Sequence, residues 1–498
     1  MSPFKLAKPH EIPGLTVFVV VHVVLWTLIP LLIRGASHFD STEALSWGLT
    51  WEWGSNKHPP LSGWLAECMN RLTGNPDLAV YLLGQICVAA AFVYIYRLAL
   101  DFLESETALL AAVFLEGIIY FNFSAVHFNV NVLSLALVPA LMFYFWRAAQ
   151  SGCYIYWLAA GILGGLLLLT KYTNLFFCLS LLCWLVFTPQ GRDQLRSGGP
   201  WLCVLATALV FLPHMAWLAR YNFEPLRYSQ AKSFNGAPFS LNGIVIWPLR
   251  LFFAQGGNAA ASLGLWALYY FRTPVAGRGS RRLPDAFLFC AGVLPLLLFL
   301  SATSLLGIRS DTKWLYAFIS FVPLLLLYCL PARNSAALTR RMLVLTYLTM
   351  AAFGLGVTIK YLCVTSLTVS IDGRRFANEM KAIWIESSDQ PLRYVGGESR
   401  CVSYVSTYLP ERPRPVWAMD TRHTVWEEES IIRDAGVLVM ARTEDEYREF
   451  REQWPRLPLP RRLDFPFNAP LSGKVGFLTV YYGVLPPESV ISLDISPG

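Results

Sequence analysis

Residues 38–64 read HFDSTEALSWGLTWEWGSNKHPPLSGW, and they follow closely on the apolar run LTVFVVVHVVLWTLIPLLI at residues 15–33. An apolar run of that length predicts a membrane-spanning helix. It is too long for a signal peptide and lacks a cleavage pattern, so we expect it to remain as an anchor. Residues 38–64 then lie just outside the bilayer, where they combine acidic, basic and tryptophan side chains. We expect the rest of the chain to be organised around this loop.

The composition excludes an ordinary soluble protein. The chain has 498 residues, of which 55% are hydrophobic and only 15% charged, and its mean hydropathy is +0.45. These values indicate a polytopic α-helical membrane protein. Apolar runs of roughly spanning length predict about eleven spans, with few charges near their centres; the runs begin near residues 15, 78, 107, 130, 156, 174, 201, 257, 286, 314 and 342.

The positions of Lys and Arg predict the orientation of these spans. Cytoplasmic loops are enriched in basic residues, and a cytoplasmic N-terminus puts one large set of them inside: Lys5, Lys8, Arg147, Arg192, Arg196, Arg272, Arg278, Arg281, Arg282, Arg333, Arg340 and Arg341. An odd number of spans then leaves the C-terminal segment outside. The net charge of +7 is therefore mostly a topology signal, and it gives no reason to expect a nucleic-acid partner.

We expect two domains, a membrane domain at 1–371 with its outer loop at 34–77, and a small outer α/β domain at 372–498. Helix-like runs occur at Arg375–Ile385 and Glu444–Trp454. Strand-like runs are predicted at Leu392–Val395, Cys401–Tyr408, Val416–Met419, Val437–Met440 and Val475–Tyr482. Cys363 and Cys401 both fall outside and could pair, although their spacing is weak evidence for a disulfide.

Asp40 and Glu43 have two compatible interpretations. Asp at a helix N-cap with Glu three residues later is an approximate capping box. The same two carboxylates could instead perform acid–base chemistry beside the membrane. Lys57 and His58 precede Pro59–Pro60, a rigid turn that could present them to a substrate. Trp47 could stack on a sugar or anchor the loop at the interface.

Further candidates follow other spans on the same outer side. His127 lies at the mouth of a span, where it could bond a sugar or satisfy a helix end. Lys171 and Tyr172 interrupt the long apolar run 155–187 at a polar turn, where Lys171 either snorkels or meets an anion. Short external loops usually contain few basic residues, yet several more are predicted on the outer side, and phosphate is their expected partner. They are Arg220, Arg227, Arg250, Arg309 and Lys313.

This distribution separates two classes of function. A transporter is expected to carry ionisable groups near the membrane midplane and to show related halves, and the sequence shows neither. An enzyme acting at the interface on a substrate with a lipid tail and an anionic head explains the outer charges better. A lipid-linked sugar transporter or flippase stays open as an alternative, as does a non-catalytic assembly protein.

Several motifs carry a resemblance to a known group. Asp40-x-x-Glu43 after the first span, His58-Pro-Pro-Leu-x-x-Trp64 and Leu169-Thr-Lys171-Tyr172 resemble the dolichyl-phosphate-mannose-protein mannosyltransferase-like group of the GT-C superfamily, which includes the lipid A aminoarabinose transferases. Trp47 with His58-Pro-Pro, Pro213-His214-x-x-Trp217 and Lys313-Trp314 are more similar to the bacterial lipid A and lipopolysaccharide-core galacturonosyl transferases. The resemblance covers roughly residues 10–330.

The resemblance implies an inverting glycosyltransferase in the bacterial inner membrane. It would take a sugar from a polyprenyl-phosphate donor at the periplasmic face and transfer it to a glycolipid acceptor, with lipid A or lipopolysaccharide core favoured and a protein acceptor as an alternative. Asp40 would be the general base, and the outer cations would stabilise the leaving phosphate. Glu43 would orient Asp40 or bind the acceptor; several relatives have adjacent acids instead. Two carboxylates could hold a divalent cation, but no third ligand supports one, and no cofactor is expected.

Overall fold

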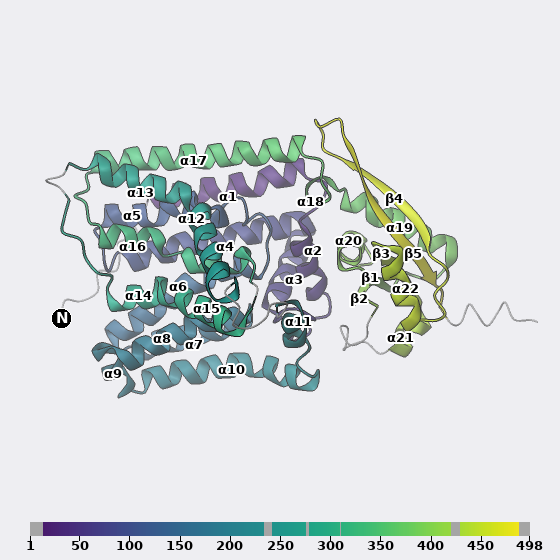
Figure 1. Cartoon of the computed structure of the whole chain (residues 1–498), viewed down its shortest axis with the longest axis horizontal. Coiled ribbons are helices and arrows are strands. Elements are labelled where there is room, and N and C mark those ends of the chain that lie inside the picture. Colours follow the sequence, from purple (N-terminus) through teal and green to yellow (C-terminus); the bar gives the residue numbers. More distant parts are fainter. Residues whose placement is uncertain (1–12, 234–241, 275–277, 309, 420–428, 488–498) are drawn as a thin grey trace, which may run out of the picture.

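The computed structural model describes residues 13–233, 242–274, 278–308, 310–419 and 429–487. It consists of a bundle of helices and a C-terminal unit built on a β-sheet, and the sheet unit sits against one end of the bundle (Figure 1). Every apolar run predicted as a span contains helical structure. Within the described residues, five helices are long and apolar enough to cross a membrane. They are α1 (Pro13–Ile33), α4 (Pro76–Ala99), α6 (Val130–Ser151), α10 (Gly199–Arg220) and α17 (Ala336–Cys363).

The remaining predicted spans are short or bent, so the number eleven stays a prediction. Two further helix pairs are apolar enough to span if each bent pair is counted as one, which raises the number to seven. The first pair, 172–195, bends by 94° and the second, 286–306, bends by 47°. The shorter helices of the bundle are α5 (Ser105–Val113), α7 (Tyr154–Leu168), α8 (Leu175–Phe187), α9 (Pro189–Leu195), α12 (Trp247–Asn258), α13 (Ala260–Arg272), α14 (Ala286–Gly292), α15 (Leu294–Leu306) and α16 (Val322–Cys329).

Small residues let neighbouring helices approach closely. In α7, a Cβ on Gly161 would lie 2.5 Å from the carbonyl oxygen of Cys203 in α10, and one on Gly165 would lie 2.5 Å from Val210 Cβ. Two glycines four residues apart therefore form the face on which α10 packs, as in small-xxx-small contacts between membrane helices.

A buried contact between a histidine and a carboxylate lies inside the bundle. His22, midway along α1, contacts Glu116 of η2 (Phe114–Gly117) at 2.7 Å, and both side chains are 0% exposed. The second ring nitrogen of His22 is 3.1 Å from Gln85 Oε1 in α4, and Trp26 Nε1 donates to Glu116 at 3.2 Å. The sequence prediction that helix centres carry few charges therefore misses this pair.

Two short helices fold the predicted outer loop over the end of the bundle: α2 (Phe39–Gly48) and α3 (Leu61–Thr73). They touch backbone to backbone, because a Cβ on Gly48 would lie 2.3 Å from the carbonyl oxygen of Gly63. Figure 1 shows α2, α3 and α11 (Glu224–Ser233) at the end of the bundle beside the sheet unit, with α9 at the opposite end.

The C-terminal unit has a five-stranded sheet in the order β2-β1-β3-β5-β4. Strands β1 (Tyr394–Gly397), β2 (Arg414–Trp417) and β3 (Val437–Ala441) are parallel. Strands β4 (Arg461–Asn468) and β5 (Val475–Leu485) continue the sheet in antiparallel pairing. Helices α19 (Gly373–Ser387), α20 (Ser399–Tyr408), α21 (Glu429–Ala435) and α22 (Glu444–Gln453) complete the unit.

The predicted strand at Cys401–Tyr408 is wrong, since this segment forms helix α20. Glu398 caps it by accepting hydrogen bonds from the backbone N–H groups of Arg400 and Cys401. Every residue from Cys401 to Tyr408 is buried, including Ser403, Ser406 and Thr407, so α20 is not a surface helix. Cys401 is a buried free thiol and Cys363 an exposed one, so the disulfide considered from the sequence is not formed.

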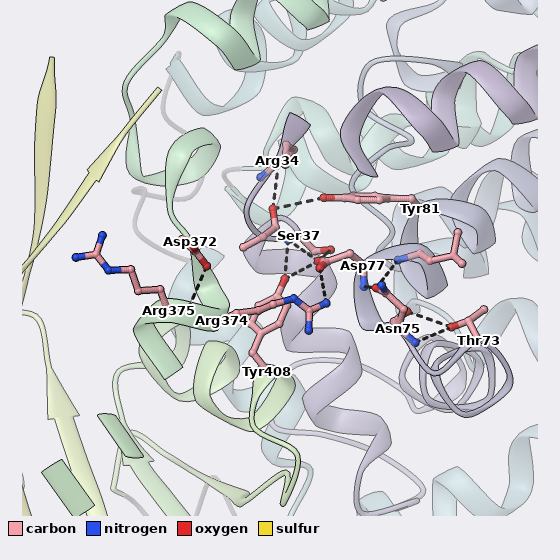
Figure 2. A network of polar contacts seen from close by, with 12 residues as sticks. Arg34, Ser37, Thr73, Asn75, Asp77, Tyr81, Asp372, Arg374, Arg375 and Tyr408 are labelled. Carbon is pink, nitrogen blue, oxygen red and sulfur yellow. Dashed lines mark hydrogen bonds and ion pairs between the residues drawn. The ribbon is translucent and has the colours of Figure 1, made fainter. Parts of the chain in front are cut away.

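A polar network joins the sheet unit to the bundle, with Asp77 of α4 at its centre (Figure 2). Asp77 Oδ1 accepts from Ser37 Oγ and from Tyr408 OH of α20, both at 2.6 Å. Its second carboxylate oxygen is 3.2 Å from Arg374 Nη2 of α19. Tyr408 OH also accepts from the backbone N–H of Ser37 at 2.7 Å. Helices of the sheet unit are thereby fixed beside the chain that enters α2.

Candidate active site

Residues from six parts of the chain enclose a cavity of about 200 Å³ at the end of the bundle that carries α2. They come from α2, the loop before α3, the start of α6, the turn between α7 and α8, α11, and the segment 313–314. The lining residues are Phe39, Asp40, Glu43, Trp47, Lys57, His58, Asn129, Val130, Asn131, Lys171, Tyr172, Thr173, Tyr228, Ser229, Lys313 and Trp314. The structure thus brings together eight sequence candidates: Asp40, Glu43, Trp47, Lys57, His58, Lys171, Tyr172 and Lys313.

Asp40 lies in the first turn of α2 but does not cap it. The N-cap is His38, whose Nδ1 accepts the backbone N–H of Asp40 at 3.2 Å. Burial lowers the pKa of His38 to about 4, although the nearby Asp40 carboxylate opposes that shift. The ring is therefore neutral at pH 7. The predicted capping role of Asp40 is wrong, because the preceding residue performs it and leaves the carboxylate at the cavity.

Glu43 is paired with the side chain of Lys57. Its carboxylate forms an ion pair with the Nζ of Lys57, and the two side chains are 7% and 15% exposed. Burial alone would lower the pKa of Lys57, but Glu43, with Tyr228 and Asp40, more than offsets it and the pKa is raised. Ser55 Oγ accepts the N–H groups of Lys57 and His58 at 3.3 and 3.0 Å, which fixes this loop. The His58 ring meets Trp47 edge to face, with centroids 5.5 Å apart.

Lys171 is a buried cation whose hydrogen-bond partner is neutral. The side chain is 6% exposed, and its Nζ donates to Asn131 Oδ1 at 2.7 Å. The ammonium also lies 5.1 Å from the centroid of the Trp314 ring. Burial, with the nearby charge of Lys313, lowers the pKa of Lys171 to about 7, while Asp311 acts in the opposite direction. An ammonium held this way gains stability from an incoming anion.

Lys313 is the more exposed cation of the cavity, at 47% of its side chain. Asp311 caps the short helix η7 (Thr312–Leu315) by accepting the backbone N–H of Lys313 at 3.2 Å. The carbonyl of Thr312 accepts from Tyr120 OH at 3.0 Å and from Gln255 Nε2 at 3.2 Å. The backbone that presents Lys313 and Trp314 is therefore anchored to the bundle.

His214 and Trp217, which belong to the Pro-His-x-x-Trp motif of α10, brace the cavity from behind. His214 Nδ1 contacts the carbonyl of Trp53, and its Nε2 lies 3.0 Å from Tyr172 OH. Trp217 Nε1 donates to Glu52 Oε2 at 2.9 Å. The motif thus connects the loop before α3 to the turn that carries Lys171.

Of the five other sequence candidates, four are described by the structure and do not line the cavity. Arg220, Arg227 and Arg250 are exposed, and Arg220 lies over the ring of Tyr221 at 5.5 Å. His127 stacks on His38 with ring centroids 4.3 Å apart. Arg309 lies outside the described residues.

Sequence reasoning assigned no site role to His38, which caps α2, or to Tyr228, which lines the cavity. Asn131 also lines the cavity, and the sequence left two uses open for it, hydrogen bonding to a sugar and satisfaction of a helix end. Asn131 follows the N-cap Asn129 and faces the cavity from the first turn of α6. Its position at the outer mouth of a span was a visible signal, but its pairing with a lysine 40 residues away was not. Among the described residues no group of three or more His, Cys, Asp or Glu side chains is arranged to hold a metal ion.

The arrangement suits anion binding next to a base. Among the described residues Lys171 has no carboxylate in hydrogen-bond contact, and Lys313 has Asp311 at 3.9 Å. The Glu43–Lys57 pair, by contrast, is already neutralised. The carboxylate of Asp40 makes no hydrogen bond within the described part of the chain. It is free to accept a proton from a bound hydroxyl.

The chain is similar to known proteins in sequence and in fold. Residues 57–217 match the family model described as dolichyl-phosphate-mannose-protein mannosyltransferase. Lipid A galacturonosyltransferase RgtD of Rhizobium johnstonii is 25% identical over 266 residues, which are 52% of this chain and 54% of that protein. The match therefore spans about half the length of that relative.

Solved structures extend the likeness to nearly the whole chain. ArnT from Cupriavidus metallidurans bound to undecaprenyl phosphate superposes with a TM-score of 0.56 at 11% identity, covering 95% of this chain and 98% of ArnT. The apo oligosaccharyltransferase of Archaeoglobus fulgidus gives 0.51 at 11% identity, covering 92% of this chain and 70% of that one. These likenesses show the fold. Residues 57–217 therefore resemble the dolichyl-phosphate-mannose-protein mannosyltransferase family, and the chain as a whole shares the fold of ArnT.

Proposed function

We propose that this protein is an inverting glycosyltransferase that moves a sugar from a polyprenyl-phosphate donor to an envelope glycolipid, with lipid A or lipopolysaccharide core as the acceptor. In this proposal residues 1–371 form the membrane domain of a bacterial inner-membrane protein, and the cavity and the 372–498 domain face the periplasm. The observation that carries it is that one cavity holds both the buried Lys171 ammonium and the Asp40 carboxylate. Among the residues that the structure describes, Lys171 has no acidic hydrogen-bond partner, and the Asp40 carboxylate lies 3.9 Å from His38 Nδ1.

The donor phosphate would bind at Lys171 and Lys313. Lys171 gives a fixed, desolvated charge, and Lys313 gives a second one from the more exposed side of the cavity. Charge aimed at the leaving oxygens in a water-poor site stabilises the transition state more strongly than it would in water. The names of the relatives are consistent with this assignment, since ArnT was crystallised with undecaprenyl phosphate.

Asp40 would act as general base. It takes the proton of the acceptor hydroxyl while that oxygen attacks the anomeric carbon of the sugar. The bond from the anomeric carbon to the phosphate oxygen breaks, and the lipid phosphate leaves with the electron pair. One displacement inverts the anomeric centre, and the phosphate needs positive charge rather than a proton donor.

The other lining residues would position these groups. Glu43 holds Lys57, so that Asp40 stays the available carboxylate. Trp47, His58 and Tyr172 form walls on which a sugar ring can pack. His127 would hold His38, the residue that caps α2, in place by stacking on its ring.

The acceptor would approach from the side of the sheet unit. The guanidinium of Arg400, at the start of α20, lies 5.4 Å from the ring of Phe39, which lines the cavity. A phosphorylated glycolipid carries negative charge that such a cation attracts. RgtD, whose name describes transfer of galacturonate to lipid A, is the relative that directs attention to this acceptor.

The test is transfer by purified Asp40→Asn compared with wild type, using undecaprenyl-phosphate sugars and lipid A as substrates and mass spectrometry as the readout. Asn keeps the volume and removes the basicity, so kcat is expected to fall by about 10²- to 10⁴-fold. Asp193→Asn, the same change on α9 at the opposite end of the bundle, is the matched control and keeps wild-type kcat.

Three results would contradict parts of the proposal. Full activity of Asp40→Asn refutes the base assignment. Transfer to a protein instead of a lipid moves the acceptor to the protein O-glycosyltransferase alternative. Movement of a lipid-linked sugar across vesicles, without transfer by wild type from any donor, favours the transporter alternative.

A further inference from the structure

We infer that a groove at the end of the bundle opposite the sheet unit binds an anionic phospholipid. The groove has a volume of about 960 Å³ and runs between the last turn of α13 and the first turns of α17. It is separate from the candidate active site and shares no lining residue with it. The inference does not depend on the proposed transferase activity.

Four arginines give the groove its charge: Arg272, Arg333, Arg340 and Arg341. All four are exposed, and no Asp or Glu is among the residues that line the groove. Within the described ranges none of the four side chains forms an ion pair. The N-terminus of the 28-residue helix α17, capped by Ser335, opens onto the same place and adds a partial positive charge.

The remaining wall of the groove is apolar. Leu268 of α13 and Val344 of α17 line it and are 45% and 54% exposed. Leu338, Met342 and Leu345 continue this surface along α17. Because α17 is long and apolar enough to cross a membrane, this wall extends along the direction in which lipid chains would lie.

Cations at one end and an apolar wall along the helices match one chemistry, a phosphodiester head with acyl chains. Arginine binds phosphate oxygens through paired N–H groups, and basic pockets at the ends of membrane helices hold anionic lipid heads. A soluble phosphate would use the cations and leave the apolar wall uncovered. A neutral lipid would cover the wall and leave four like charges close together without a counter-ion.

The test compares two double variants of the full-length protein in detergent, with dioleoyl phosphatidylglycerol and dioleoyl phosphatidylcholine as probes and native mass spectrometry as the readout. Arg340→Gln/Arg341→Gln removes two groove charges. Arg281→Gln/Arg282→Gln removes two exposed charges from the nearby chain, outside the groove lining. Wild type is expected to bind the glycerol lipid at least tenfold more tightly than the choline lipid, since each basic contact adds a substantial part of such a factor.

The groove variant is expected to lose roughly tenfold or more in affinity for the glycerol lipid, while the control variant stays within about twofold of wild type. Equal losses in both double variants would mean that net charge, not this groove, holds the lipid. Unchanged binding by the groove variant, or equal binding of both lipids by wild type, would also overturn the inference. Elution of each variant as wild type on a sizing column confirms that it is folded.

Discussion

The proposed phosphate site predicts that donor binding weakens as pH rises through neutrality. Burial lowers the pKa of Lys171 to about 7, so its charged fraction falls from about 0.9 at pH ~6 to about 0.03 at pH ~8.5. A sugar phosphodiester keeps one negative charge over this range. If phosphate binds only the charged lysine, KM for the donor rises about 30-fold between these pH values. Initial rates at varied donor concentration measure KM separately from kcat. This separation matters because the titration of a general base changes kcat.

Two variants sharpen this prediction. Lys171→Met removes the titrating group, so its KM is expected to be high and independent of pH. Lys313→Met removes a positive charge that lowers the pKa of Lys171, so the rise in KM moves to higher pH. A flat KM in wild type, or the same slope in Lys171→Met, would show that this lysine does not bind the donor phosphate. A shift to lower pH in Lys313→Met would refute the electrostatic coupling.

Two further predictions concern the supports of the site. Glu43→Gln leaves the partly buried Lys57 without its counter-ion and is expected to lower the free energy of unfolding by about 1–3 kcal/mol, measured by thermal unfolding in detergent. The double variant Glu43→Gln/Lys57→Met is expected to recover most of this loss. A double variant as unstable as Glu43→Gln would refute the pairing argument. Asp77→Asn removes a charged acceptor shared by Ser37, Tyr408 and Arg374. It is expected to lower the free energy of unfolding by about 1.5–3 kcal/mol and to speed proteolysis between the bundle and the sheet unit. Asp464→Asn, on an exposed strand position, is the control, and equal proteolysis of both variants would contradict the role of Asp77.

The sequence predicted the site residues that lie directly next to the end of an apolar run. Asp40 after the first apolar run, Lys171 at the break in a long one and Lys313 before another were each expected on one side of the membrane, and they line one cavity. Segments that leave the bilayer on the same side are confined to one layer. Topology therefore limits the distance between side chains that are far apart in the chain.

The sequence did not predict which of these side chains bind to one another. Asn131 meets Lys171 and Lys57 meets Glu43 because of how α2, α6 and the loops pack, and a single sequence does not encode that register visibly. It also put three exposed arginines, Arg220, Arg227 and Arg250, with the cavity cations, because outer position alone does not distinguish a lining residue from its neighbours. His38 was overlooked because Asp40 is the commoner cap.

The errors in the C-terminal unit have a similar origin. Helix α20 packs against both α2 and the sheet. Its valines and tyrosines alternate with smaller polar residues, a pattern that is also typical of a strand. Strand β4 was missed because it carries Arg461, Arg462, Asp464 and Pro466, which are typical of an exposed edge rather than of a core strand.

The contact between His22 and Glu116 inside the bundle bears on how the chain is inserted during synthesis. Segment 105–121 pairs a helix of nine residues with a carboxylate, Glu116, that would cost about 2.5–3.5 kcal/mol at the centre of a lone segment in lipid. Its partners, His22 and Trp26, both lie on α1, and His22 in turn contacts Gln85 on α4, so all three are translated earlier. The third hydrophobic segment is therefore expected to leave the insertion machinery only when the first two wait beside it, so that these three enter the bilayer as one assembled group.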